Sequence, residues 1–547
     1  RAAEELLGRL SVLLPKEKMP RADTLHALAL EFWQGEKPVI LSGEGSARAF
    51  MAANAAVEKK SAEAMFYALE KAREQMDVPA ELAESLNRYR QWKRERGLAD
   101  YTDLPECWLR ELRGQNYGVS KPWQHVLVDE VQDLSPLQRA LIQELSPADG
   151  SGFFGIGDPD QSIYSFRGAD GNIEEALRQR WPKLAVLTLG ESHRSSEGIL
   201  KAGRMALGGR GACSALHSVA ATGATLQWMR VPTGEREAEW IAGRIAGLLG
   251  GTSHAEADQH ASVAGCHLEA GSCSPGDIAV LCRLKALIPS IKSALERRGI
   301  PCASPEAEAF WQDERVERML TAAAVYLRKR SHDQKESALH DALRFPLLAV
   351  AAPSAYAGPS LDPPWDAIPP EAWDKGPHAV LDRAAKHFDP LFADSLPFRR
   401  LCASWQEHGG WEGLLGHVAL RREIDAVRNK AEYVQIVTMH ASKGLEFKAV
   451  FIPGCEDGIL PFRGAEALLE QRPGSSMDLG DEEESRLMYV GITRAAEAVF
   501  LSSASRRTLY GKSLALAPSP LIPRECFQCI RLEKHTRTVA SQLNLLS

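Results

Sequence analysis

The sequence has no apolar stretch long enough to cross a membrane. Its longest strongly apolar runs, such as 345–353, fall well short of the roughly 18 residues that a spanning helix needs. Cysteines are few, and ten of them scattered among 547 residues suit a reducing cytoplasm better than a disulfide framework. Neither sign of charge dominates, because 65 Lys and Arg face 72 Asp and Glu for a net charge of −7. A membrane protein and a uniformly basic nucleic-acid coat are therefore excluded, but a basic groove is not.

The sequence does not begin with Met, and its first residues lack the apolar core of a signal peptide. Residues 1–7 already follow helical periodicity, so we expect the chain to begin in the middle of a domain. The length predicts three to five domains at about 100 to 200 residues each. With 44% apolar and 25% charged residues, the composition is typical of a globular protein.

Short continuous apolar runs that end in polar or glycine-rich turns recur along the chain. Runs of this kind predict buried parallel strands. Between them, residues 31–115 and 305–430 are helical in pattern and rich in charge or in Ala, Leu and Arg. We therefore predict an α/β protein with at least two sheets, each carrying an inserted helical subdomain. The predicted strands are 125–129, 152–157, 184–189, 278–282, 434–438, 450–453 and 498–502.

Two adjacent carboxylates follow the first of these strands. Asp129 and Glu130 would stand at the carboxyl edge of a parallel sheet, where such folds bind their ligands. An Asp there can hold Mg²⁺ through its water shell, and a neighbouring Glu can orient an attacking water. Taken alone, such a pair is more often a helix N-cap or a solvated turn.

A second polar segment, 157–169, follows the next strand. It carries Gln161, which can sense a phosphate oxygen, and then Tyr164, Phe166 and Arg167, which can stack on and grip single-stranded bases. Core packing is the alternative for the two aromatic rings. Together with the Asp-Glu strand, the segment is too specific for that alternative.

At these residues the chain resembles the UvrD/Rep/PcrA family of superfamily 1 DNA helicases. Residues 129–133 are similar to the family's Walker B motif, and 157–169 are similar to the motif that couples nucleotide to DNA. Further motifs follow in family order along nearly the whole chain. The other matching segments are 1–6, 23–28, 100–104, 189–195, 438–447, 483–495 and 542–546.

The resemblance implies roles for individual residues. Asp129 with Mg²⁺, Glu130, Gln161 and the arginine finger Arg494 would catalyse ATP hydrolysis. The residues implied to bind ATP are Gln161, His193, Arg194, Lys443, Glu446 and Arg494. The residues implied to bind DNA are Thr24, His26, Tyr164, Phe166, Arg167, Thr438 and His440. Taken singly, Arg494 could lie on a helix surface, His440 in a core and Lys443 in an ordinary turn.

The resemblance also implies the architecture. Two RecA-like parallel-sheet domains, 1A and 2A, would face each other across a cleft, and each would carry a helical subdomain, 1B or 2B. Domain 1A would be incomplete. The expected boundaries are 1–30 and 116–205 for 1A, 31–115 for 1B, 206–304 and 431–547 for 2A, and 305–430 for 2B.

One family feature is missing from the sequence. No Gly-x-x-x-x-Gly-Lys-[Ser/Thr] phosphate loop occurs, and Gly511-Lys512-Ser513 lacks the upstream glycine. We expect the chain to be a fragment that begins just after this loop. Residues 1–547 alone should then be unable to hydrolyse ATP, because the groups that cradle its β- and γ-phosphates are gone.

Other departures are milder. His193 stands where a Tyr is usual, Phe166 replaces a Trp, and Leu25 replaces a Phe, which can weaken base contacts without abolishing them. Cys526 and Cys529 have metal-ligand spacing but lack a complete set of four ligands, which favours an incidental pair over a zinc site.

The implied function is an ATP-dependent 3′–5′ DNA helicase or translocase in the cytoplasm. It would act on single-stranded DNA and on single-strand/duplex junctions, with repair or replication proteins as further partners. Two alternatives stay open. A catalytically inactive DNA-binding scaffold would fit the missing phosphate loop, whereas an exonuclease subunit of the RecB/AddA type would need a nuclease domain for which too few residues follow Arg494.

Overall fold

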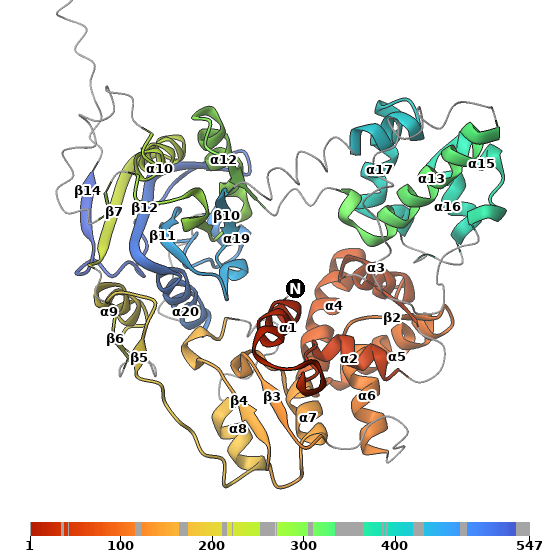
Figure 1. The fold of residues 1–547 in the computed structure, drawn as a ribbon, viewed down its shortest axis with the longest axis horizontal. Coiled ribbons are helices and arrows are strands. Elements are labelled where there is room, and N and C mark those ends of the chain that lie inside the picture. Colours follow the sequence, from red (N-terminus) through yellow and green to blue (C-terminus); the bar gives the residue numbers. More distant parts are fainter. Residues whose placement is uncertain are drawn as a thin grey trace, which may run out of the picture. The chain divides into compact units, whose positions relative to one another are not determined.

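A computed structural model gives the fold of the chain (Figure 1). None of the described helices is long and apolar enough to cross a membrane. The structure describes residues 2–33, 38–41, 43–114, 123–163, 173–209, 216–220, 223–251, 268–269, 271–304, 310–333, 365–385, 388, 392–418, 432–470 and 479–531.

The chain forms two compact units, each built from segments that are distant in sequence. The domain boundaries expected from the sequence stay predictions. The first unit contains residues 1–157, 164–184 and 308–427, and the second contains 158–163, 185–307 and 428–547.

The second unit is organised around an eight-stranded sheet. The strand order is β14-β7-β12-β11-β8-β10-β9; these neighbours are all parallel, while β13 pairs antiparallel with β12. This large parallel sheet confirms the expected α/β class. The strands are β7 (Thr225–Thr233), β8 (Ile278–Cys282), β9 (Cys302–Ala303), β10 (Val434–Thr438), β11 (Phe447–Ile452), β12 (Ala495–Leu509), β13 (Lys512–Ala515) and β14 (Gln528–Arg531).

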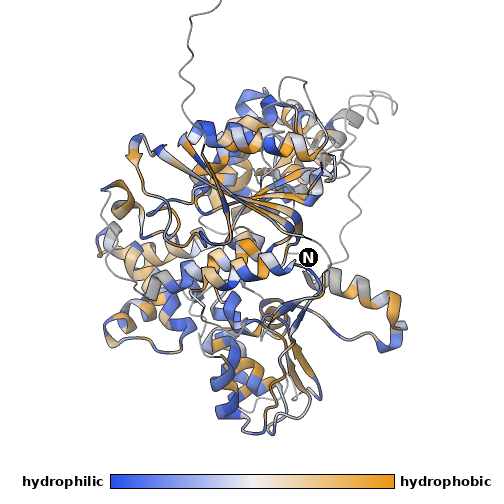
Figure 2. Ribbon diagram, turned by 90° about the vertical axis from the view of Figure 1, so that its left-hand side faces the viewer, coloured by the Kyte–Doolittle hydropathy of each residue, from blue (hydrophilic) through white to orange (hydrophobic). Residues whose placement is uncertain are grey.

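Helices cover this sheet and complete its core. All five side chains of β8 are buried, as expected for a continuous apolar run in the middle of a parallel sheet. Apolar residues of α10 and α12 pack with those of β8, β10, β11 and β12 in one cluster. Figure 2 shows hydrophobic residues running along the strands of this sheet. The other described elements of this unit are β5 (Glu191–Ser192), α9 (Glu197–Ala206), β6 (His217–Ser218), α10 (Gly234–Leu248), α12 (Ile288–Arg297), α19 (Ala465–Leu469) and α20 (Leu479–Thr493).

Three charged residues of the second unit are buried. Arg507 on β12 donates hydrogen bonds of 2.7 Å to both Glu237 and Glu456, and Glu456 also accepts the backbone N–H of Ala504. Burial raises the pKa of Glu456 to about 7, with Arg507 opposing the shift and Glu237 adding to it.

We expect Glu456 to make the stability of the protein depend on pH. The folded-state pKa of about 7 lies above the ordinary value of 4.5, so the folded chain binds more protons between these values than the unfolded chain does. The free energy of unfolding should therefore fall as pH rises from about 5 to 8. Urea denaturation at several pH values should show a smaller fall in Glu456→Gln, which cannot titrate. An equal fall in both proteins would contradict the assignment.

The described residues of the first unit contain two parallel sheets of two strands each, β1 with β2 and β3 with β4, and surrounding helices. In the second of these sheets Val126 of β3 pairs with Phe153 of β4, and Val126, Ile142 and Trp181 belong to one buried cluster. The elements are α1 (Ala2–Leu13), α2 (Leu25–Glu31), β1 (Val39–Ile40), α3 (Gly43–Ala53), α4 (Lys59–Glu74), α5 (Ala80–Arg94), β2 (Leu98–Ala99), α6 (Asp103–Arg113), β3 (Val126–Val128), α7 (Pro136–Leu145), β4 (Phe153–Gly155) and α8 (Ile173–Arg180).

Residues 310–418 of this unit add helices with a core of their own. Trp373 and Trp411 are both buried there, and the indole N–H of Trp411 donates to the carbonyl of Trp373 at 2.9 Å. The helices are α13 (Glu314–Asp333), α15 (Pro370–Lys375), α16 (Pro377–Ala384) and α17 (Leu396–Glu407).

One predicted strand is wrong. Residues 184–189 form no strand, and the side chains of Leu187 and Leu189 are 87% and 85% exposed. The apolar run has the composition of a strand, but it has no strand partner among the described residues and buries little of its apolar surface.

Candidate functional site

Asp129 and Glu130 follow β3 directly, as the sequence predicted. The Asp129 side chain is exposed and accepts the backbone N–H of Glu130 at 3.0 Å. Glu130 has a left-handed backbone with a φ of 53°, which is uncommon for a residue other than glycine and is often found at functional sites. Its carboxylate accepts the side-chain amide of Gln132. The turn thus exposes the carboxylate of Asp129 to solvent, while Gln132 holds the carboxylate of Glu130 in place.

The end of β4 packs closely against this turn. The backbone N–H of Val131 donates to the carbonyl of Ile156 at 3.0 Å. A Cβ added at Gly157 would lie 2.3 Å from the side-chain oxygen of Gln132, which only a glycine avoids. The Asp-Glu turn and the end of the neighbouring strand therefore form one rigid edge.

The Asp158–Gln161 turn belongs to the second unit. Asp158 caps the short 3-10 helix Pro159–Gln161, accepting the backbone N–H of Asp160 at 3.0 Å and the side-chain amide of Gln161 at 2.7 Å. Burial raises the pKa of Asp158, and these two hydrogen bonds oppose the shift. Because the Gln161 amide nitrogen faces a carboxylate, its oxygen is left to accept.

Arg494 donates to that oxygen. Its guanidinium Nη2 lies 2.9 Å from Gln161 Oε1, while Nε and Nη1 donate to the carbonyls of Val490 and Leu445 at 3.2 and 3.3 Å. The Lys443 ammonium donates to the backbone carbonyl of Gln161 at 2.9 Å. Three residues that the family resemblance assigned to ATP, from distant parts of the sequence, are therefore joined by hydrogen bonds.

Helix α20 ends at Thr493, directly before Arg494, and carries Tyr489 in its last turns. The Tyr489 hydroxyl lies 3.5 Å from Asp158 Oδ2. A Cβ at Gly203 of α9 would lie 3.0 Å from the Tyr489 ring, so glycine allows the two helices to approach closely. Sequence reasoning did not assign Asp158 or Tyr489 to the site, although Asp-Pro is a recognisable start of a short helix.

Arg194 and Glu446 form an ion pair in the second unit. Arg194 is partly buried, and its Nε has no hydrogen-bond partner among the described residues. His193 is exposed and lies 4.0 Å from Glu191. A donor nitrogen that is buried without an acceptor is costly, and an anionic ligand would supply the acceptor.

Two of the expected DNA contacts, Thr438 and His440, lie at the end of β10. Thr438 Oγ1 accepts the backbone N–H of Ala441 at 3.3 Å, and both side chains are half-buried. Thr438 is the last residue of β10, and His440 begins the short 3-10 helix that directly precedes Lys443.

The other two described contacts belong to α2 of the first unit. Thr24 caps this helix, accepting the N–H of Ala27 at 3.3 Å, and therefore has a structural task of its own. His26 lies edge-on to Tyr101 at 5.8 Å, and burial lowers its pKa.

Three of the residues expected to bind DNA, Tyr164, Phe166 and Arg167, lie outside the described residues. In the described part of the chain no group of three His, Cys, Asp or Glu side chains could hold a metal ion, and Cys526 and Cys529 are free thiols.

Comparisons with known proteins identify both parts of the chain. Residues 44–182 match the UvrD/REP helicase N-terminal domain, and residues 407–506 match the UvrD-like helicase C-terminal domain. The chain is 30% identical to the ATP-dependent DNA helicase UvrD2 of Mycobacterium tuberculosis over 71% of this chain and 48% of that protein. It is 28% identical to DNA helicase II of Escherichia coli over 80% of this chain and 64% of that protein.

A third relative is the ATP-dependent DNA helicase PcrA of Bacillus subtilis, which is 24% identical over 77% of this chain and 61% of that protein. The chain thus spans about half to two thirds of the length of these relatives. With both family domains matched and an α/β fold of RecA-like type, the chain belongs to the UvrD/Rep family of helicases.

Proposed function

We propose that this chain forms part of the motor of an ATP-dependent DNA helicase that moves 3′ to 5′ along single-stranded DNA. The observation that carries the proposal is the bonded set of Gln161, Lys443 and Arg494. The side chain of Gln161 is held between Arg494 and the carboxylate of Asp158. If its amide senses a bound phosphate, a change in the nucleotide would be felt by both of these residues. The family relationship supports the same activity.

The residues fit a triphosphate with a divalent cation. Asp129 offers an exposed carboxylate at a strand end, which suits a hydrated Mg²⁺ ion. When bound, Mg²⁺ supplies charge that neutralises the phosphate oxygens. Glu130 would orient the attacking water, and Arg194 and Arg494 would hold the γ-phosphate while its bond to ADP breaks. In this proposal Gln161 senses the γ-phosphate and Glu446 reaches the nucleotide.

The polarity of movement gives the sharpest test. We expect the whole gene product, with ATP and Mg²⁺, to unwind a duplex with a 3′ single-stranded tail and to leave the 5′-tailed duplex intact. Strand displacement can be followed with a fluorophore and quencher on the two strands. Because the amide is isosteric with the carboxylate, Glu130→Gln should bind both substrates and unwind neither.

Two results would contradict the proposal. Unwinding of the 5′-tailed duplex alone would reverse the polarity. Binding of DNA without any ATP-driven unwinding by the wild-type protein would favour a DNA-binding scaffold.

A further inference from the structure

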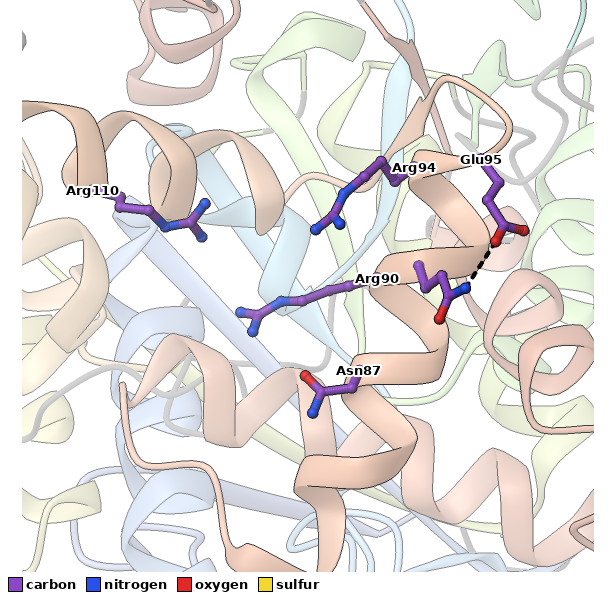
Figure 3. A pocket seen from close by; sticks show the side chains of 6 residues that line it. Asn87, Arg90, Arg94, Glu95 and Arg110 are labelled. Atoms are coloured by element: carbon purple, nitrogen blue, oxygen red, sulfur yellow. Dashed lines mark hydrogen bonds between the residues drawn. The ribbon is translucent and has the colours of Figure 1, made fainter.

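A cavity of about 720 Å³ opens between α5 and α6 of the helical insertion, away from the residues discussed so far. Figure 3 shows the guanidinium groups of Arg90 and Arg94, from α5, pointing into the same space as that of Arg110, from α6. The cavity is lined by Asn87, Arg90, Gln91, Arg94, Glu95 and Arg110.

The lining of this cavity carries an excess of positive charge. Arg90 pairs with Glu106 at 2.8 Å, but Glu106 also accepts from the buried Arg73 at 3.1 Å. Glu95 accepts the side-chain amide of Gln91 at 2.9 Å, on the outer side of α5 in Figure 3. Among the described residues, neither Arg94 nor Arg110 has a carboxylate within ion-pair distance.

Water screens the repulsion among these arginines because Arg94 and Arg110 are exposed, but their convergence attracts an anion. Arg90 and Arg94 are four residues apart and therefore share a face of α5, where like charges repel. A cation is excluded by the same charge. Within the described part of the chain, Arg94 and Arg110 also have no ion-pair partner that would explain why they converge.

The lining residues favour a phosphate over a base or a whole nucleotide. Guanidinium groups match phosphate oxygens in paired hydrogen bonds. None of the six lining residues is aromatic or aliphatic, so a base would find no surface on which to stack. Three converging arginines can instead hold consecutive phosphates of one strand.

We propose that this arginine pocket, defined as Asn87, Arg90, Arg94 and Arg110, binds the phosphate backbone of DNA without reading its sequence. The inference rests on the proposed function for the identity of the nucleic acid. It adds a DNA-binding site in the helical insertion to the DNA contacts that the family resemblance implies.

The test compares two double variants that each remove two positive charges. Arg94→Gln/Arg110→Gln empties the pocket of its exposed arginines. The matched control, Arg96→Gln/Arg113→Gln, removes one arginine beside α5 that stacks on Trp92 and one from α6 that pairs with Glu144. Neither control residue lines the cavity.

Affinity for a fluorescent single-stranded oligonucleotide is measured by anisotropy at several salt concentrations. Each phosphate contact contributes about 0.7 to the slope of log affinity against log salt on a single strand. We expect the pocket variant to lower that slope by about 1.4 and to weaken binding roughly tenfold near 0.1 M salt, equally for oligonucleotides of different sequence. The control should change both quantities much less.

The outcomes separate the two proposals. Wild-type protein that binds no oligonucleotide would overturn the proposed function and this inference with it. Wild-type binding that persists unchanged in the pocket variant, or falls equally in the control, would overturn this inference alone. Thermal melting of both variants should match the wild type because the replaced side chains are exposed.

Discussion

Replacement of Arg494 by alanine is expected to lower ATP turnover by the whole gene product roughly a hundredfold or more, while ATP binding survives. An arginine finger acts on the charge that develops in the transition state, so its loss should reduce the rate more than the affinity. In the structure, the carbonyls of Val490 and Leu445 and the amide of Gln161 fix three nitrogens of this guanidinium. That fixed orientation is what a finger needs.

Controls separate this role from a structural one. Arg494 is buried, so its removal can also destabilise the second unit. Thermal melting and nucleotide affinity show whether the variant is folded, and Arg506→Ala removes an exposed arginine from the same unit as a matched control. Arg494→Lys should remain slow because an ammonium cannot make the same forked contacts. Near-normal turnover in folded Arg494→Ala would remove the finger assignment.

Strands could be predicted where both faces of the strand are buried, because every side chain is then apolar and the sequence shows a continuous apolar run. This holds for β8, whose five side chains are all buried, and for β10 and β11. It fails at 184–189, where Leu187 and Leu189 are exposed. Composition reports the tendency of a segment to form a strand, but pairing depends on a neighbour that the local sequence does not contain.

The site was predictable in its residues and not in its contacts. Family motifs selected Gln161, Lys443 and Arg494, and their roles remain predictions. Their hydrogen bonds join residues 282 and 333 positions apart, which no local pattern specifies. Asp158 was missed because its contribution is to hold the side-chain amide of Gln161. Both this hydrogen bond and the burial of the Asp158 carboxylate arise only in the folded chain.

The same limit applies to the segment 100–104, which the resemblance matched without implying any role. Asp100 and Asp103 are buried and accept hydrogen bonds of 2.9 and 2.8 Å from Arg73 of α4. Lys93 of α5 pairs with both carboxylates as well. The segment therefore joins three helices of the first unit through charges that are withdrawn from water.

This network reaches the turn that follows the Asp-Glu motif. Glu74, one residue beyond Arg73 on α4, accepts the hydroxyl of Ser135, which caps α7. Burial raises the pKa of Glu74. Loss of the buried charges should therefore loosen the helical insertion and the start of α7 together.

We expect Arg73→Met to lower the free energy of unfolding of the first unit by about 3 to 5 kcal/mol, because several buried carboxylates lose their main partner. Arg73 also donates to Glu70 at 2.7 Å and to Glu106 at 3.1 Å, so one substitution affects four acidic side chains. Urea denaturation measures the loss. The control Arg178→Met breaks an exposed pair with Glu174 and should cost less than about 1 kcal/mol.

The pH dependence of that loss identifies its cause. Burial raises the pKa of Glu70 to about 7 even with Arg73 present, and removing the guanidinium should raise it further. Protonation at pH 5 would then relieve the repulsion among the carboxylates, so the difference between Arg73→Met and wild type should be smaller at pH 5 than at pH 8. A loss that is the same at both pH values would mean that Arg73 stabilises the unit by packing its side chain, and a variant as stable as wild type would mean that the four carboxylates do not depend on its charge.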